Sequence, residues 1–209
     1  MMGSVIPLGD GATGKSVITQ LLINENLTED ERNSILKESR KSFNIEMEFK
    51  KGEAMIDGKD IVTSEQFYVF PGQRQKISEI APTFDEILAI FEFMPAIKNV
   101  SVLLLVYDIT RLESLKSLET WTNVALQREW ITDKTLTVLV SNKSDLQQPN
   151  LDFVEKVREG VSKLIGSYEQ HKAAEQVRTI TTSGLTGEGI QDLKSMISNW
   201  IASQGKHLT

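Results

Sequence analysis

The chain has 209 residues, of which 40% are hydrophobic and 25% are charged, and its formal net charge is −6 at pH 7. This size and composition are typical of one globular domain that buries a sizeable core, so we expect a single domain over residues 1–209. The acidic balance lacks the clustered basic face of nucleic-acid-binding proteins, so we expect no nucleic acid among the partners. Because the sequence has no cysteine, disulfides, thiolate metal sites, thiol catalysis and cysteine-linked lipid anchors are excluded.

Apolar runs in the sequence are short. The longest of them, VSVLLLV at residues 100–106, is far below the roughly 18 residues that a membrane-spanning helix needs. No basic stretch followed by an apolar one, as in an export signal, precedes the first predicted strand. We therefore expect a cytoplasmic protein without a membrane anchor of its own.

Short apolar runs alternate with helical patterns along the chain, which is typical of an α/β fold with a mostly parallel sheet. The patterns predict six strands, at residues 4–8, 45–49, 67–70, 102–107, 137–141 and 177–182, with the second and third joined through Asp57-Gly58. Helices are expected over residues 17–24, along a stretch after residue 72 that has Pro82 in its first turn, and over residues 190–201.

Two of the predicted strands are unusual. The strand at residues 102–107 is apolar at every position, so we expect it to be covered on both faces of the sheet. Pro7 lies in the first strand, which should be central, and proline cannot donate a hydrogen bond to a neighbouring strand. We therefore expect either a bulge at Pro7 or a position whose N–H would have had no partner.

The sequence GDGATGKS, residues 9–16, matches the phosphate-binding pattern G-x-x-x-x-G-K-[ST]. Such a loop wraps a phosphate with inward-pointing backbone N–H groups, and the helix that follows adds the positive end of its dipole. We expect Lys15 to reach the β- and γ-phosphates and the Ser16 hydroxyl to ligate Mg²⁺. An ordinary glycine turn is the alternative. The predicted phosphate-binding residues are Gly9, Asp10, Gly11, Ala12, Thr13, Gly14, Lys15, Ser16 and Val17.

The sequence NKSD, residues 142–145, directly follows the predicted strand at residues 137–141. It should therefore lie at a carboxyl strand edge, where ligands bind in open α/β sheets. Guanine presents N1–H and N2–H₂ as adjacent donors that one carboxylate can accept, whereas adenine has no such pair. We expect Asp145 to select guanine, Asn142 to brace the loop and the Lys143 stem to cover one face of the ring. An Asn-Lys-x-Asp surface turn is the alternative.

With both motifs present, the chain resembles the Ras-like small GTPases nearly from end to end. The sequence LVYDITRLESLKSLETW looks like the fourth strand and following helix of Rab-type members. Thr182-Ser183-Gly184 falls where the family uses Ser-Ala-Lys to hold the guanine oxygen, which adds Ser183, Gly184 and Leu185 to the predicted nucleotide-binding residues. Leu185 replaces the lysine and keeps only its apolar packing. The resemblance implies a three-layer P-loop NTPase fold with helices on both faces of the sheet, GTP and GDP as ligands, Mg²⁺, and slow hydrolysis of GTP.

The sequence YVFPGQRQ, residues 68–75, falls where the family has an Asp-x-x-Gly element, whose aspartate supports Mg²⁺ through water and whose glycine N–H binds the γ-phosphate. Alignment on Gly72 puts Gln73 where the family has the glutamine that orients attacking water, and Val69 where it has the aspartate. Gln73, Lys15 and Gly72 are therefore the predicted catalytic residues. A Pro-Gly-Gln sequence without the aspartate is similar to the bacterial and archaeal MglA-like GTPases. Loss of a residue that supports a metal through its ligands typically lowers metal affinity or activity by about 10–100-fold. We therefore expect nucleotide binding to depend less on Mg²⁺ than in typical members.

The segment before the second predicted strand should supply a threonine to Mg²⁺ and the γ-phosphate, but Thr28 comes too early and only Ser39 and Ser42 are candidates. Arg40 is either an arginine finger in cis, as is thought of MglA-like proteins, or simply a solvated loop arginine. Gly11 leaves room for the catalytic glutamine where family side chains would crowd it, although turn geometry also explains a glycine there.

We expect residues 28–44 and 70–98 to respond to the bound nucleotide and to bind effectors, activating proteins or exchange partners. The apolar cluster in the second segment belongs either to this surface or to the core; it comprises Phe84, Phe91, Phe93 and Met94. The leading prediction is a GTP-hydrolysing switch, and the alternative is a GTP/GDP-binding interaction protein with little or no hydrolysis. A P-loop kinase is a third possibility, against which NKSD argues.

Overall fold

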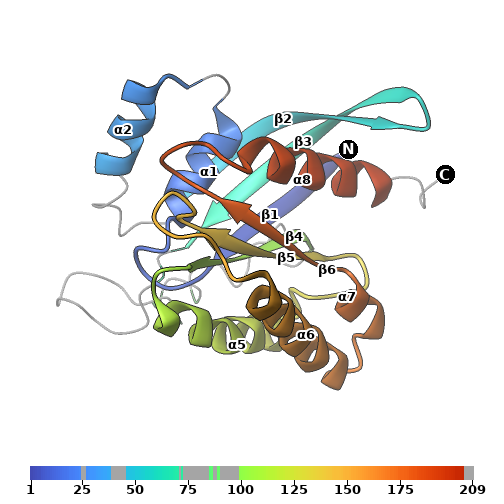
Figure 1. The fold of residues 1–209 in the computed structure, drawn as a ribbon. Coiled ribbons are helices and arrows are strands. Elements are labelled where there is room, and N and C mark those ends of the chain that lie inside the picture. The colour runs from blue at the N-terminus through green and yellow to red at the C-terminus, as the bar shows by residue number, and fades with distance from the viewer. Residues whose placement is uncertain are drawn as a thin grey trace.

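The structure is a computed structural model that describes residues 1–24, 27–38, 46–70, 72, 85–86, 89 and 99–204. Within these residues, six strands form one sheet in the order β2-β3-β1-β4-β5-β6 (Figure 1). Strand β2 runs antiparallel to β3, and every other neighbouring pair is parallel. The strands are β1 (Met2–Leu8), β2 (Glu46–Ile56), β3 (Lys59–Val69), β4 (Val100–Asp108), β5 (Leu136–Asn142) and β6 (Val177–Thr182).

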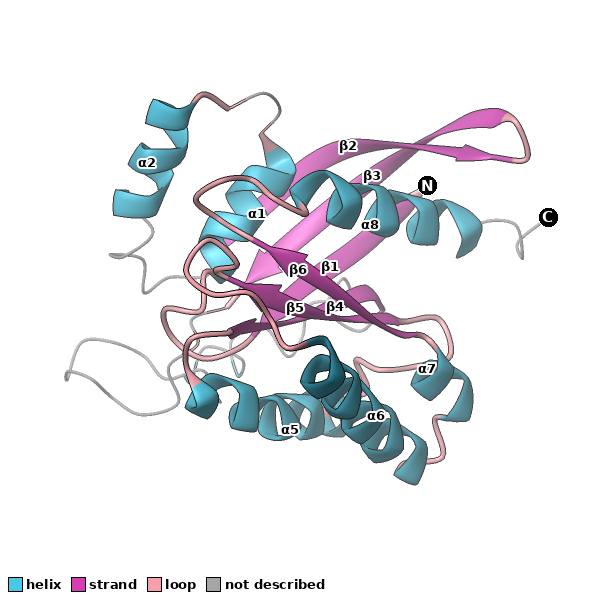
Figure 2. Cartoon of the chain, viewed as in Figure 1, coloured by secondary structure: helices cyan, strands magenta, loops and turns pink. Residues whose placement is uncertain are grey.

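Helices cover both faces of this sheet, as Figure 2 shows. One face carries α1 (Lys15–Ile23) and α8 (Ile190–Gln204), and α2 (Glu29–Glu38) lies beside α1. The other face carries α5 (Leu112–Gln127), α6 (Leu151–Ser167) and the short α7 (His171–Glu175). The predicted fold class, a three-layer α/β fold with a mostly parallel six-stranded sheet, is confirmed.

Strand β4 explains why the two helical layers stay attached to one sheet. Leu103 and Leu105 belong to the apolar cluster under α5 and α6, whereas Leu104 and Val106 belong to the cluster under α1 and α8. Because successive side chains of a strand point to opposite faces, a strand that is apolar throughout fills both cores at once. The prediction made for residues 102–107 is therefore confirmed.

The sheet differs from the prediction in the length of two strands. Strands β2 and β3 form a continuous hairpin from the pair Glu46–Val69 to the pair Ile56–Lys59, which is much longer than the predicted strands at 45–49 and 67–70. One face of the edge strand β2 is exposed, so charged residues alternate with other residues along it. A search for apolar runs therefore does not detect the full length of this strand. The predicted turn is correct: Asp57 and Gly58 have φ values of 52° and 72°, as a tight two-residue hairpin turn requires.

Pro7 does not cause a bulge. The irregularity in the pairing of β1 with β4 lies between Ser4 and Val5, and Pro7 itself stays in register with Leu104. The pairing of β1 with β3 ends at Val5, so Pro7 has a partner strand on one side only. This agrees with the second of the two expectations, a position at which an N–H is not needed on one side.

Several predictions fall outside the described residues. Most of the helical stretch expected after residue 72 is among them, as are Ser39, Arg40, Ser42, Gln73, Phe84, Phe91, Phe93 and Met94. Helices α2, α6 and α7 were not predicted. In the part of the chain that the structure describes, no helix is both long and apolar enough to span a membrane.

Candidate functional site

The loop at residues 9–16 joins the carboxyl end of β1 to the first turn of α1, and close neighbours require glycine at two of its positions, Gly9 and Gly14. Gly9 has φ 147° and Gly14 has φ 98°, a region that side-chain-bearing residues rarely adopt. A Cβ atom at Gly9 would clash with the Val106 carbonyl oxygen, and one at Gly14 would clash with the Asn142 amide. The loop is therefore held tightly against β4 and against the start of the NKSD sequence.

Lys15 lies at the centre of this loop, with its ammonium group buried. Its Nζ donates hydrogen bonds to the carbonyl oxygens of Gly9, at 2.9 Å, and Asp10, at 2.8 Å. Burial lowers the pKa of Lys15 to about 8; the negative charge of Asp10 opposes this, the positive charge of Arg111 adds to it, and the charge of Glu46 opposes it. A buried cation whose hydrogen bonds within the described residues go to neutral carbonyls is well suited to meet an anion such as a phosphate.

The Gly72 backbone also lies against this loop. A Cβ atom there would clash with the Gly9 carbonyl oxygen and with Lys15 Nζ, so the chain passes the phosphate loop at this residue. Val69, at the end of β3, is buried with 3% of its surface exposed, and it belongs to neither apolar core cluster. Gln73, which follows Gly72, is outside the described residues.

Asn142 connects the NKSD sequence to the phosphate loop. Its Nδ2 donates a hydrogen bond of 2.8 Å to the Thr13 carbonyl oxygen, and its Oδ1 accepts one of 3.2 Å from Thr182 Oγ1. Asn142 is the last residue of β5, and Thr182 is the last residue of β6. One buried amide thus joins three loops at the carboxyl edge of the sheet.

Asp145 is held by the loop after β6. The Ser183 hydroxyl donates a hydrogen bond to Asp145 Oδ1, and Ser183 Oγ accepts hydrogen bonds from the Leu185 N–H, at 3.1 Å, and the Thr186 N–H, at 3.0 Å. For the Gly184 N–H, the described residues supply no acceptor. The Leu185 side chain is 45% exposed. The hydrogen bond from Ser183 therefore places the carboxylate of Asp145, from the loop after β5, beside the Gly184 amide and the Leu185 side chain of the loop after β6.

The structure adds contacts that sequence reasoning missed. Lys143 Nζ donates a hydrogen bond of 2.6 Å to Asp108 Oδ2, and Arg111 Nε lies 3.6 Å from the same oxygen. Arg111 Nη2 also donates to the Gly11 carbonyl oxygen at 3.1 Å. Burial disfavours the charged form of Asp108, but hydrogen bonds from Lys143 and Thr110 hold its pKa below the usual value. Asp108 ends a buried strand at the carboxyl edge, and that position is the signal that could have revealed it.

Two more side chains support the loops from outside the predicted motifs. Trp121 Nε1 on α5 donates a hydrogen bond of 2.8 Å to Asp10 Oδ1 in the phosphate loop. Arg32 Nη1 on α2 donates one of 2.9 Å to the Thr186 carbonyl oxygen. No local sequence pattern announces either contact, because each joins residues more than a hundred positions apart.

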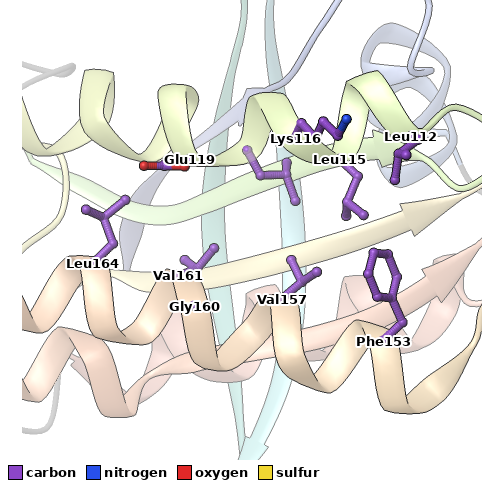
Figure 3. A pocket seen from close by; sticks show the side chains of 10 residues that line it. Leu112, Leu115, Lys116, Glu119, Phe153, Val157, Gly160, Val161 and Leu164 are labelled. Carbon is purple, nitrogen blue, oxygen red and sulfur yellow. The ribbon is translucent and has the colours of Figure 1, made fainter.

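An apolar groove of about 490 Å³ lies elsewhere, between α5 and α6 (Figure 3). The Phe153 ring points from α6 toward Leu112 and Leu115 on α5. None of the predicted nucleotide-binding residues lines it. Its lining has little to bind a phosphate or to read a purine, so it is not the site that the sequence predicts.

The Ras family model matches residues 93–202, which is more than half of the chain. The chain belongs to the Ras family. The match includes the NKSD sequence and the loop after β6 but not the loop at residues 9–16. No curated protein matches the chain. Ras-family proteins are in general switches that bind guanine nucleotides and Mg²⁺.

Proposed function

We propose that this Ras-family protein is a guanine-nucleotide-dependent switch that binds GTP and GDP and hydrolyses GTP slowly, and that residues 1–209 form its single domain. The observation that carries the proposal is the hydrogen bond from the Asn142 side chain to the Thr13 carbonyl oxygen. It holds the loop suited to phosphates and the loop suited to guanine side by side at one edge of the sheet. A nucleoside diphosphate has the same arrangement, with phosphates at one end and a purine at the other.

In this proposal the phosphate loop holds the β-phosphate with its backbone N–H groups, and Lys15 turns from its carbonyl partners to the phosphates. Asp145 accepts the two guanine donors, the Gly184 N–H donates to the guanine oxygen, and the Lys143 stem and Leu185 cover the ring. Val17 follows Ser16 on α1, and its side chain lies against Gly184 in the loop after β6. The remaining nucleotide-binding residues are those of the loop at residues 9–16.

For hydrolysis we propose that Gln73 orients the attacking water, that the Gly72 N–H binds the γ-phosphate, and that Lys15 stabilises the charge that develops on it. The close approach of the Gly72 backbone to Lys15 and to the Gly9 carbonyl oxygen supports this. We also propose closeness to the MglA-like members on the basis of that sequence.

Mg²⁺, when bound, neutralises charge on the β- and γ-phosphates. The donor set here fits this ion, because Mg²⁺ at nucleotide sites is bound by one or two protein groups together with phosphates, and Ser16 directly follows the buried Lys15. The Ser16 hydroxyl, in the first turn of α1, is the residue that would hold it.

Residues 28–44 and 70–98 are the proposed contact segments for effectors, activating proteins and exchange factors in the cytoplasm. Within the first segment, α2 is tied to the guanine-side loop through Arg32 and Thr186. A change in how that loop holds the purine would therefore act on α2 directly.

A guanine-nucleotide-binding protein with little hydrolysis is the second candidate, and it is motivated by Val69, a buried apolar residue at the position where the resemblance leads one to expect an aspartate. Single-turnover hydrolysis of bound GTP separates the two, with Gln73→Leu as comparison. A slow rate that falls in the variant supports the GTPase, and equal rates remove Gln73 from the mechanism.

The test of nucleotide binding itself is direct. The purified protein is denatured and any released nucleotide is identified, and binding of GDP and ADP to nucleotide-free protein is then measured by calorimetry. We expect GDP to bind far more tightly than ADP, and Asp145→Ala to remove that preference. Equal affinity for the two nucleotides, or binding of neither, would refute the proposed function.

A further inference from the structure

The β2–β3 hairpin puts Glu46 directly opposite Val69. Residues paired across an antiparallel hairpin point to the same face of the sheet. Phe67, two residues before Val69, packs into the apolar cluster under α1 and α8, so Val69 and Glu46 both face the α1 side. Val69 occupies the position at which Ras-like proteins have their Mg²⁺-supporting aspartate. A carboxylate therefore exists at this place on the sheet, but on the neighbouring strand.

The contact between β2 and α1 shows what Glu46 faces. Gln20 Nε2 on α1 donates a hydrogen bond of 3.2 Å to Glu48 Oε1 on β2. Both elements run away from the phosphate edge, so moving back two residues on β2, about 6.6 Å, corresponds to moving back four residues on α1, about 6 Å. Those steps lead from Glu48 to Glu46 and from Gln20 to Ser16, which is the residue that would hold the ion.

One carboxylate oxygen of Glu46 has no partner among the described residues. The side chain is half-buried, and its Oε2 is fully buried without a hydrogen bond from any described residue. A buried carboxylate oxygen without a partner costs free energy, so such an oxygen marks a place where a ligand is expected. Glu46 is also close enough to the phosphate loop for its charge to raise the pKa of Lys15 against the larger effect of burial.

We propose that Glu46 supplies the carboxylate that supports Mg²⁺ beside Ser16, in place of the acid missing at Val69. This inference rests on the proposed function, because Mg²⁺ would be bound together with the nucleotide phosphates. It reverses the expectation drawn from Val69 alone: the dependence of nucleotide binding on Mg²⁺ is retained in this protein through β2. Because Glu46 and Val69 are paired, a carboxylate at either position points to the same face of the sheet. The fold therefore permits the carboxylate to move from β3 to β2.

The experiment measures the release of a fluorescent GDP analogue against the concentration of free Mg²⁺, and again in EDTA. In the wild-type protein, Mg²⁺ should slow release strongly. Glu46→Gln preserves the size of the side chain and should raise the Mg²⁺ concentration needed for half of the slowing by about 10–100-fold, with no faster release in EDTA. Glu48→Gln is the matched control, since it lies on the same strand and face, and it should leave the Mg²⁺ dependence unchanged.

A second variant tests the exchange of strands. Val69→Asp, placed in the Glu46→Gln background, should restore the lost Mg²⁺ dependence at least in part. The inference is overturned if Glu46→Gln leaves the Mg²⁺ midpoint where it was, if Glu48→Gln shifts it equally, or if Glu46→Gln speeds release in EDTA as much as in Mg²⁺. Failure of the wild-type protein to bind the GDP analogue in EDTA and in Mg²⁺ alike would instead refute the proposed function.

Discussion

The Lys143 ammonium group donates a hydrogen bond of 2.6 Å to Asp108, whose side chain is only 1% exposed. Through Arg111, which pairs with Asp108 and donates to the Gly11 carbonyl oxygen, this pair connects the guanine-side loop to the phosphate loop. The connection runs beside the one that Asn142 makes to Thr13. The two halves of the proposed nucleotide site are thus joined twice, by one neutral amide and by one charged chain of contacts.

We expect Asp108→Asn to destabilise the protein by about 1–3 kcal/mol at pH 7, because a charge-assisted hydrogen bond is replaced by a neutral one at a buried position. Denaturation in urea measures the loss. Asp133→Asn is the matched control, because its ion pair with Lys172 is long, at 3.8 Å, and both side chains are more than half exposed. That variant should change the free energy of unfolding by no more than about 0.5 kcal/mol. Equal effects of the two substitutions would contradict the role given to Asp108.

The same pair predicts a pH dependence. The pKa of Asp108 is lower in the folded than in the unfolded chain, so its ionised form stabilises the fold above its unfolded pKa. That contribution is lost as pH falls through the folded pKa. The difference in unfolding free energy between wild type and Asp108→Asn should therefore be complete at pH 6–7 and shrink below about pH 4. A difference that stays constant over this range would show that the charge is not its cause.

Gly184 and Val17 predict a compensating pair of substitutions. A Cβ atom on Gly184 would lie 2.8 Å from Val17 Cγ1, which is too close for real atoms, and the backbone of Gly184 is not in a strained region. Gly184→Ala should therefore weaken GDP binding several-fold by pushing the loop after β6 away from α1. Adding Val17→Ala should recover most of the affinity, a non-additivity that a double-mutant cycle of GDP dissociation constants measures. Simple additivity of the two losses would exclude a steric cause.

The sequence predicted those parts of the site that are contiguous. The loop at residues 9–16 and the NKSD sequence each carry their chemistry within a few residues, and the apolar strands before them fix their place at the carboxyl edge. The Asn142–Thr13 contact joins residues 129 positions apart, so only the folded chain reveals which loop Asn142 braces. The pairing of Glu46 with Val69 could have been found by counting residues outward from the Asp57-Gly58 turn. The strands predicted at 45–49 and 67–70 do not reach that turn, so they do not fix the pairing.

Helix α2 shows a signal that was present and overlooked. Thr28 and Glu31 form a reciprocal capping box, in which the Thr28 N–H donates to Glu31 Oε2 at 2.7 Å and the Glu31 N–H donates to Thr28 Oγ1 at 3.3 Å. Thr28 comes too early in the sequence to be the metal-binding threonine expected in this segment. Its sequence, Thr-x-x-Glu, predicts the start of a helix, and that is its role in the fold.

Lys15 predicts proton uptake on nucleotide binding. With a pKa of about 8, half of the Lys15 side chains in the free protein are neutral at pH 8. Phosphates favour the charged form, so GDP binding without added metal should take up about half a proton at pH 8 and much less at pH 7. Affinity should fall as pH rises through this range. Calorimetric titrations in buffers of different ionisation enthalpy measure the uptake.

Lys15→Arg is the control for this measurement, because an arginine side chain stays charged throughout. If the variant binds GDP, its binding should take up no proton near pH 8. Proton uptake that is the same in both proteins, or that does not rise between pH 7 and 8 in the wild type, would assign the proton to another group.

Asp145 predicts an exchange of purine specificity. One carboxylate oxygen accepts from Ser183, so the carboxylate is fixed in the position where it would accept guanine N1–H and N2–H₂. Asp145→Asn keeps an acceptor for Ser183 and turns an amide NH₂ donor toward the base. Xanthine has a carbonyl oxygen where guanine has its amino group, so this variant should prefer xanthosine diphosphate and should bind GDP at least about 100-fold more weakly. Competition of the two diphosphates against a fluorescent nucleotide measures both affinities. Asp145→Ala is the control, because it should lower the affinity for GDP without raising the affinity for xanthosine diphosphate. If Asp145→Asn still preferred GDP, another group would have to recognise the purine.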